Sequence, residues 1–61
     1  MEFSTKLQEL RKKKGISQQR LATDLNTTQN TISRYETGER EPGIDDLTKI
    51  ADYFNVSVDY L

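Results

Sequence analysis

The chain contains no cysteine, histidine or tryptophan and only one proline among its 61 residues. Without cysteine it can form neither a disulfide nor a thiolate metal site, and without histidine it lacks the commonest metal ligand and acid–base group. It also has no apolar run of about 18 residues and no signal-peptide pattern. We therefore expect a soluble cytoplasmic protein that holds no metal and no cofactor.

The size of the chain argues against an enzyme. A chain this short makes one domain, residues 1–61, and buries only about 60% of the surface that its unfolded form exposes. The acidic pairs, Asp45 with Asp46 and Glu39 with Glu41, have no second partner at catalytic spacing. Because there is no room for a deep pocket either, we do not expect enzymatic activity.

The net charge is −1, so the chain as a whole is not the basic domain that usually binds nucleic acid. The charges are, however, unevenly distributed. Residues 1–40 contain eight Lys or Arg against five Asp or Glu, a net charge of +3, whereas residues 41–61 contain one Lys against five acids, a net charge of −4. This polarity is compatible with one face turned toward phosphates, although it could also arise by chance in so short a chain.

Two short helical patterns at the centre of the sequence predict a helix-turn-helix. The first covers about residues 18–25 and the second residues 29–37. Ser17 and Thr28 are good N-caps for their starts, and Asn26 fits the left-handed position that follows the first helix. Helices of this length with so short a connection match the compact helix-turn-helix arrangement.

The second of these helices has an unusual polar face. Ile32 and Tyr35 recur on one side, and the opposite arc of about 140° is polar. This outward arc consists of Gln29, Asn30, Ser33, Arg34 and Thr37. Such amides, hydroxyls and a guanidinium can pair with base edges in a DNA major groove. The alternative is a solvated face with no partner, but a face kept for solubility usually carries Glu and Lys, which favour helix more strongly.

An amphipathic pattern near the N-terminus predicts a first helix. Its apolar repeat consists of Phe3, Leu7 and Leu10. Ser4 or Thr5 can start this helix as N-cap, and Gly15 can end it in the left-handed conformation. The basic run 11–14 fills the last turn, where cations complement the helix dipole and need no further partner. Arg11 lies close to the buried stripe, so we expect it to find an acidic partner inside the fold.

The strongest periodic stripe belongs to a fourth helix, after a connector broken by Pro42. Its apolar members, which we expect to form the fourth wall of the core, are Ile44, Leu47, Ile50, Ala51 and Phe54. Asn55 can end this helix, and Ser57 can cap a fifth helix that is only begun at the C-terminus. Tyr53 and Tyr60 could belong to the core edge or to a contact with another subunit, and we assign both to the core.

Three motifs follow one another in the order and spacing of a known family: LRKKKGISQQRLA, TTQNTISRYETGEREP and LTKIADYFNVSVDYL. Through them the chain, from about Thr5 to Leu61, resembles the Cro/repressor (Xre-type) helix-turn-helix family and is similar in detail to small phage repressor and Cro proteins. The resemblance implies an all-α, compact five-helix lambda-repressor-like domain. Its helix-turn-helix is formed by helices 2 and 3, and its third helix enters the DNA major groove.

The resemblance also assigns base contacts by position. They fall to Thr28, Gln29, Asn30, Ser33 and Arg34. Gln29 or Asn30 would bond to adenine N6 and N7, and Arg34 to guanine O6 and N7. Thr28 and Ser33 would lie near a thymine methyl or the backbone. Ser33 stands where some relatives carry a longer side chain, so we expect weaker readout there.

The remaining implied roles concern phosphates and the fold. Phosphate contacts fall to Gln18, Thr37 and Arg40, helped by backbone N–H groups of the loop after the third helix. Gln18 would also brace Gln29. Arg11 and Glu36 would form a structural ion pair between helices one and three, with no base contact.

Three classes of function remain. The first is sequence-specific binding of double-stranded DNA by a transcriptional regulator, a repressor, acting as a homodimer on a palindromic operator. The second is a protein-interaction module on the same fold, such as an antitoxin, which an exposed apolar patch on the fourth and fifth helices would favour. The third is a bare structural helical domain, which burial of the polar arc would favour.

Overall fold

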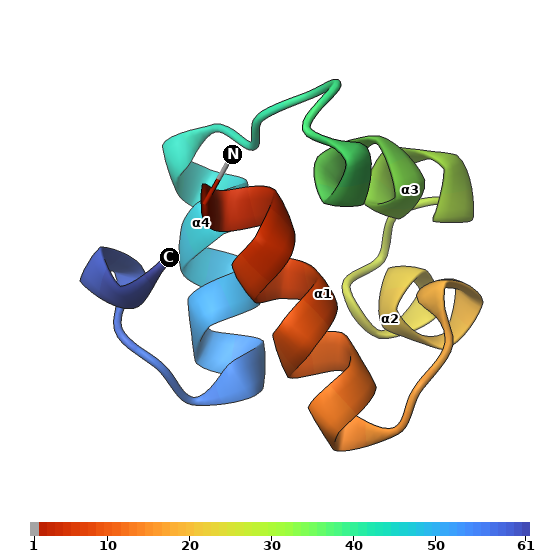
Figure 1. Ribbon diagram of the computed structural model, residues 1–61, viewed down its shortest axis with the longest axis horizontal. Coiled ribbons are helices and arrows are strands. Elements are labelled where there is room, and N and C mark those ends of the chain that lie inside the picture. The colour runs from red at the N-terminus through yellow and green to blue at the C-terminus, as the bar shows by residue number, and fades with distance from the viewer. Residues whose placement is uncertain (1) are drawn as a thin grey trace.

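The computed structural model describes residues 2–61 and is shown in Figure 1. The elements are α1 (Glu2–Lys14), α2 (Gln18–Asp24), α3 (Gln29–Thr37), α4 (Ile44–Phe54) and the 3-10 turn η1 (Val58–Tyr60). The described chain is therefore all-α, with four α-helices and no strand. No helix among residues 2–61 is long and apolar enough to cross a bilayer.

The fifth α-helix that the sequence predicted is a single 3-10 turn in the structure. Ser57 caps it as expected, because its hydroxyl accepts a hydrogen bond from the Tyr60 N–H at 3.1 Å. The backbone carbonyls of Ser57 and Val58 then accept from Tyr60 and Leu61, three residues on. That spacing defines the tighter 3-10 pattern rather than an α-helix.

The start of α1 also differs from the prediction. The helix already includes Glu2, so Ser4 and Thr5 lie within its first two turns and neither is its N-cap. Phe3 lies in this first turn and packs against the core, with its ring edge-on to Tyr35 at 6.0 Å between centroids. Gly15 ends the helix as predicted, with a φ of +76°.

The helix-turn-helix follows its local signals closely. Ser17 Oγ accepts from Arg20 N at 3.0 Å and Thr28 Oγ1 accepts from Thr31 N at 3.2 Å, so both predicted N-caps are present. Asn26 adopts the predicted left-handed conformation, with a φ of 60°.

α1 crosses the middle of the molecule, with α2 and α3 on one side and α4 on the other (Figure 1). The buried core is drawn from all four helices and consists of Leu7, Leu21, Ala22, Leu25, Ile32, Tyr35 and Ile50. Ile50 and Ala51 of the α4 stripe are buried, but Ile44 is 68% exposed, so its assignment to the core was wrong. Ile44 is the first residue of α4 and reaches past the edge of the core. Tyr60 is exposed as well, whereas Tyr53 packs against the core as predicted.

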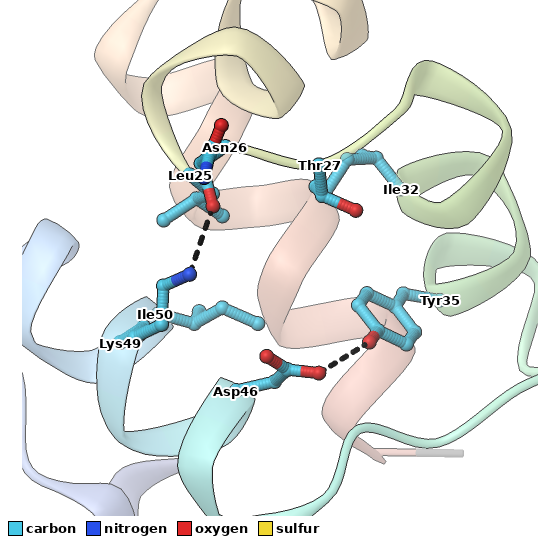
Figure 2. Close-up of a pocket in the computed structure, with 8 residues that line it drawn as sticks. All are labelled: Leu25, Asn26, Thr27, Ile32, Tyr35, Asp46, Lys49 and Ile50. Atoms are coloured by element: carbon cyan, nitrogen blue, oxygen red, sulfur yellow. Dashed lines mark hydrogen bonds between the residues drawn. The ribbon is translucent and has the colours of Figure 1, made fainter.

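α4 is joined to the helix-turn-helix across a small cavity of about 100 Å³ (Figure 2). Tyr35 donates its hydroxyl to Asp46 Oδ2 at 3.3 Å, and Lys49 Nζ donates to the Leu25 carbonyl at 3.0 Å. Burial, reinforced by the nearby Asp46 charge, raises the pKa of Tyr35. These two hydrogen bonds tie α4 to α3 and to the end of α2.

A second polar bridge ties α2 to α4 at the surface. Tyr53 donates its hydroxyl to Asp24 Oδ2 at 2.6 Å, and Arg20 Nε pairs with the same oxygen at 3.0 Å. Lys14, from the end of α1, lies over the Tyr53 ring at 5.1 Å from its centroid. Three helices therefore meet at this cluster.

Candidate nucleic-acid interface

The polar arc of α3 is open to solvent. Gln29, Asn30, Arg34 and Thr37 are exposed and Ser33 is half-buried, whereas Ile32 and Tyr35 on the opposite side are buried. The protein does not cover the arc. A bare structural helix bundle would have required a covered arc, so its exposure argues against that class. The structure thus brings together all the side chains predicted to contact bases, along one helix and its N-cap.

The ion pair predicted between Arg11 and Glu36 is present. Arg11 Nε lies 2.6 Å from Glu36 Oε2 and Nη2 lies 3.0 Å from Oε1, so the pair is bidentate, with side chains only 13% and 3% exposed. The hydrogen bond to Glu36 raises the pKa of Arg11, against the effect of burial. The third nitrogen, Nη1, donates to the Ile16 carbonyl at 3.0 Å. α3 is thus clamped to α1 and to the segment that leads into α2.

Gln18 extends this clamp toward the exposed arc. Its Nε2 donates to Glu36 Oε1 at 3.0 Å, and its Oε1 accepts from Gln29 Nε2 at 3.4 Å. An ionised carboxylate can only accept, so the Gln18 nitrogen must face Glu36 and its oxygen must face Gln29. Gln29 is consequently held by one N–H, and its second N–H and its oxygen make no other hydrogen bond among residues 2–61.

A further contact from α1 was not predicted. Gln8 Nε2 donates to the backbone carbonyl of Glu36 at 2.9 Å, so α1 grips the side chain and the main chain of the same residue. The sequence did contain a signal, because Gln8 precedes Arg11 by three residues and therefore shares its helix face.

The Thr28 hydroxyl is already engaged at the start of α3. It caps the helix and lies 3.0 Å from the Thr31 hydroxyl. The hydrogen bonds of this hydroxyl are therefore made within α3, and the predicted contact with a thymine methyl would need only the Thr28 methyl group.

Several donors at the end of α3 and in the loop that follows it converge on one acceptor, the carbonyl of Arg34. It receives the backbone N–H groups of Glu39 at 3.0 Å and Arg40 at 3.3 Å, that of Gly38, and the Thr37 hydroxyl at 3.1 Å. These N–H groups are therefore not free for phosphates, contrary to the expectation from the sequence. The Arg40 side chain is exposed, and the Thr37 hydroxyl would have to exchange its present acceptor for a phosphate.

The structure has a short helix, a tight turn and a second helix whose polar face is exposed and held by hydrogen bonds. This is the arrangement of a helix-turn-helix domain. The helix-turn-helix family (HTH_3) matches residues 7–61, and the chain belongs to this family. The transcriptional regulator ImmR of Bacillus subtilis is 41% identical over 61 residues, which cover all of this chain and 48% of ImmR. The transcriptional activator BcrR of Enterococcus faecalis is 39% identical over 61 residues, which cover all of this chain and 30% of BcrR.

A solved structure supports the same fold. The restriction-modification controller protein C.AhdI from Aeromonas hydrophila superposes with a TM-score of 0.86 at 27% identity. The superposition covers 97% of this chain and 86% of that protein. The chain spans about half or less of the length of the two curated relatives, but most of the length of this structural neighbour.

Proposed function

We propose that the chain is the DNA-binding domain of a transcriptional regulator and reads a specific double-stranded sequence with α3 in the major groove. The observation that carries this proposal is the exposed arc of α3, held in place by the hydrogen-bonded series Arg11, Glu36, Gln18 and Gln29. A helix that must read bases has to be fixed relative to the helices that meet the backbone. The names of the relatives, which are transcriptional regulators, support the same function.

Base readout falls to the side chains with free donors and acceptors. Gln29 keeps one N–H and its oxygen, which match adenine N7 and N6. Arg34 matches guanine O6 and N7 bidentately. Asn30 lies beside Gln29 on the same arc and has the same chemistry, while Thr28 and Ser33 supply shorter contacts.

Phosphate contacts flank this arc. Gln18, at the start of α2, has one N–H left after its bond to Glu36 and can donate it to a phosphate. Arg40 lies in the loop beyond the other end of α3, with Thr37 beside it. Contacts at both ends of the reading helix would fix its register along the groove.

We further propose that two copies bind a palindromic operator, with half-sites about 34 Å apart on one face of the duplex. The exposed Ile44 of α4 and Tyr60 of η1 supply apolar surface for contact between the copies. A domain bound over a promoter excludes polymerase with no further machinery, so we assign it repression.

The same apolar side chains support a second candidate, an antitoxin-type module that binds a non-identical protein. The two candidates differ in what occupies Ile44 and Tyr60. A sedimentation measurement of the purified chain with a duplex that carries both half-sites would separate them, because contact between copies makes the second copy bind more tightly than the first, whereas an interaction module fills the two half-sites independently.

Selection of bound duplexes from a random library tests the proposed function. We expect the winners to contain two inverted half-sites about one helical turn apart, each with a guanine and an adenine in conserved positions. A pool that remains random after repeated rounds would rule out sequence-specific binding.

A further inference from the structure

Glu39 lies beside the Arg34 side chain, in a loop segment whose backbone is hydrogen-bonded back onto α3. Its backbone N–H is bonded to the Arg34 carbonyl and also lies 3.4 Å from Thr37 Oγ1, so the main chain is fixed at two points. Its carboxylate oxygen Oε2 then lies 3.7 Å from Arg34 Nε. The two side chains are 50% and 65% exposed, and both stand at the C-terminal end of the polar arc.

We propose that Glu39 is a positioning residue that determines specificity by holding Arg34 for base readout and by repelling phosphates. The proposal rests on the function proposed above and adds a residue to it. Nothing in the sequence motifs had assigned Glu39 to the interface, and a carboxylate in a loop that runs along a DNA backbone requires an explanation.

The chemistry of the pair gives the first part of that explanation. Glu39 engages Nε, which leaves the two terminal nitrogens of Arg34 for guanine O6 and N7. Without this partner the long Arg34 side chain can turn to a phosphate instead, a contact that carries no sequence information. The carboxylate therefore favours the rotamers of Arg34 that face the groove.

The charge of Glu39 gives the second part. Non-specific binding depends almost entirely on attraction between basic side chains and phosphates, so a carboxylate at the interface weakens it. At the specific site the carboxylate is offset by Arg34, which is itself bound to guanine. At other sites Arg34 lacks its guanine, and the repulsion between Glu39 and the phosphates is less well compensated.

The loop provides a matched control. Glu41 carries the same charge two residues further on and is also exposed, but it lies beyond the segment bonded to the Arg34 carbonyl. Substituting either residue with glutamine removes one negative charge. Only the Glu39 substitution removes the partner of Arg34.

The experiment measures dissociation constants for the operator found by selection, for that operator with the Arg34 base pair changed, and for an unrelated duplex. Relative to Glu41→Gln, we expect Glu39→Gln to lower discrimination at the Arg34 base pair by about threefold to tenfold and to leave the other positions unchanged. We expect Glu39→Asp to restore part of that discrimination. In an Arg34→Ala background, Glu39→Gln should no longer alter discrimination.

Equal effects of Glu39→Gln and Glu41→Gln would overturn this inference, because they would reduce Glu39 to one charge among several. A change in discrimination at the Arg34 base pair that Glu39→Gln still causes in the Arg34→Ala background would overturn it as well. Both outcomes leave the proposed function intact, since the unsubstituted chain would still select an operator. Failure of the unsubstituted chain to select any sequence would overturn both.

Discussion

α3 and α4, which lie on opposite sides of α1 (Figure 1), are held to the rest of the molecule by different contacts. α3 is fixed to α1 and α2 by polar bonds that meet at one buried residue, Glu36, from Arg11, Gln18 and Gln8. α4 instead rests on the apolar core through Ile50, with polar bridges to its neighbours. Hydrogen bonds are directional and apolar contacts are not. α3 also contributes Ile32 and Tyr35 to the core, so what distinguishes it from α4 is that its polar bonds converge on one buried residue, which fixes its orientation.

The largest expected effect comes from removing Glu36, on which the polar bonds that hold α3 converge. Glu36→Ala leaves Arg11 buried without its partner, which should cost about 3–5 kcal/mol of unfolding free energy. In a domain of this size we expect the melting temperature to fall by more than about 10 °C. Circular dichroism melts would measure it, with Glu41→Ala as the exposed control. An unchanged melting temperature would disprove the clamp.

The next effect is expected on DNA binding rather than on folding. Arg34→Ala should lose about 1–3 kcal/mol at a single base pair and relax the preference there. Arg40→Ala should weaken binding to all sequences alike and flatten the salt dependence by about one ion. Titrations at several salt concentrations would separate the two. Identical salt slopes and identical sequence preferences for both variants would show that the site is assigned wrongly.

A smaller effect is expected from pH, at the bridge between α2 and α4. The hydrogen bond from Tyr53 lowers the pKa of Asp24 below its ordinary value of 3.8; burial opposes the shift and Arg20 adds to it. A depressed folded-state pKa contributes stability above the unfolded value and loses it as the pH falls through the folded value. We therefore expect the melting temperature to fall below about pH 4, and Tyr53→Phe to make this fall shallower. Equal falls in melting temperature with pH for the unsubstituted protein and for Tyr53→Phe would show that the bond between Tyr53 and Asp24 does not cause the loss of stability.

The smallest effect on folding is expected at the exposed start of α4. Ile44→Ser should change the unfolding free energy by less than about 0.5 kcal/mol, because the side chain is outside the core. Ile50→Ala in the same helix should cost about 2–5 kcal/mol. If Ile44 serves the contact between copies, Ile44→Ser should also weaken cooperative binding to a two-half-site operator. A large loss of monomer stability from Ile44→Ser would contradict the claim that this side chain lies outside the core.

The difference between the helix-turn-helix and α4 also explains which features could be predicted from the sequence. In the helix-turn-helix, the caps Ser17 and Thr28 and the left-handed Asn26 act within three or four residues of themselves, and all were predicted correctly. In α4 the periodicity identified the helix and the buried Ile50. It could not show that Ile44 passes the edge of the core, because that depends on how far the neighbouring helices reach.

The candidate site was predictable to a similar extent. The outward direction of the α3 arc follows from helical geometry, and its exposure agrees with the prediction. The resemblance to the family pointed to Arg11 and Glu36. The shared helix face of Gln8 and Arg11 indicated where Gln8 points, but its bond to the Glu36 carbonyl depends on how α1 packs on α3, and the contact of Glu39 with Arg34 depends on how the loop turns back after α3.

The most direct test of the account is a nuclear magnetic resonance titration of the chain with its selected operator. We expect the largest shifts at the side-chain amides of Gln29 and Asn30 and at the Arg34 Nε–H, with small shifts along α4. The largest shifts on α4 and η1, with the α3 arc unchanged, would contradict the claim that this arc reads DNA.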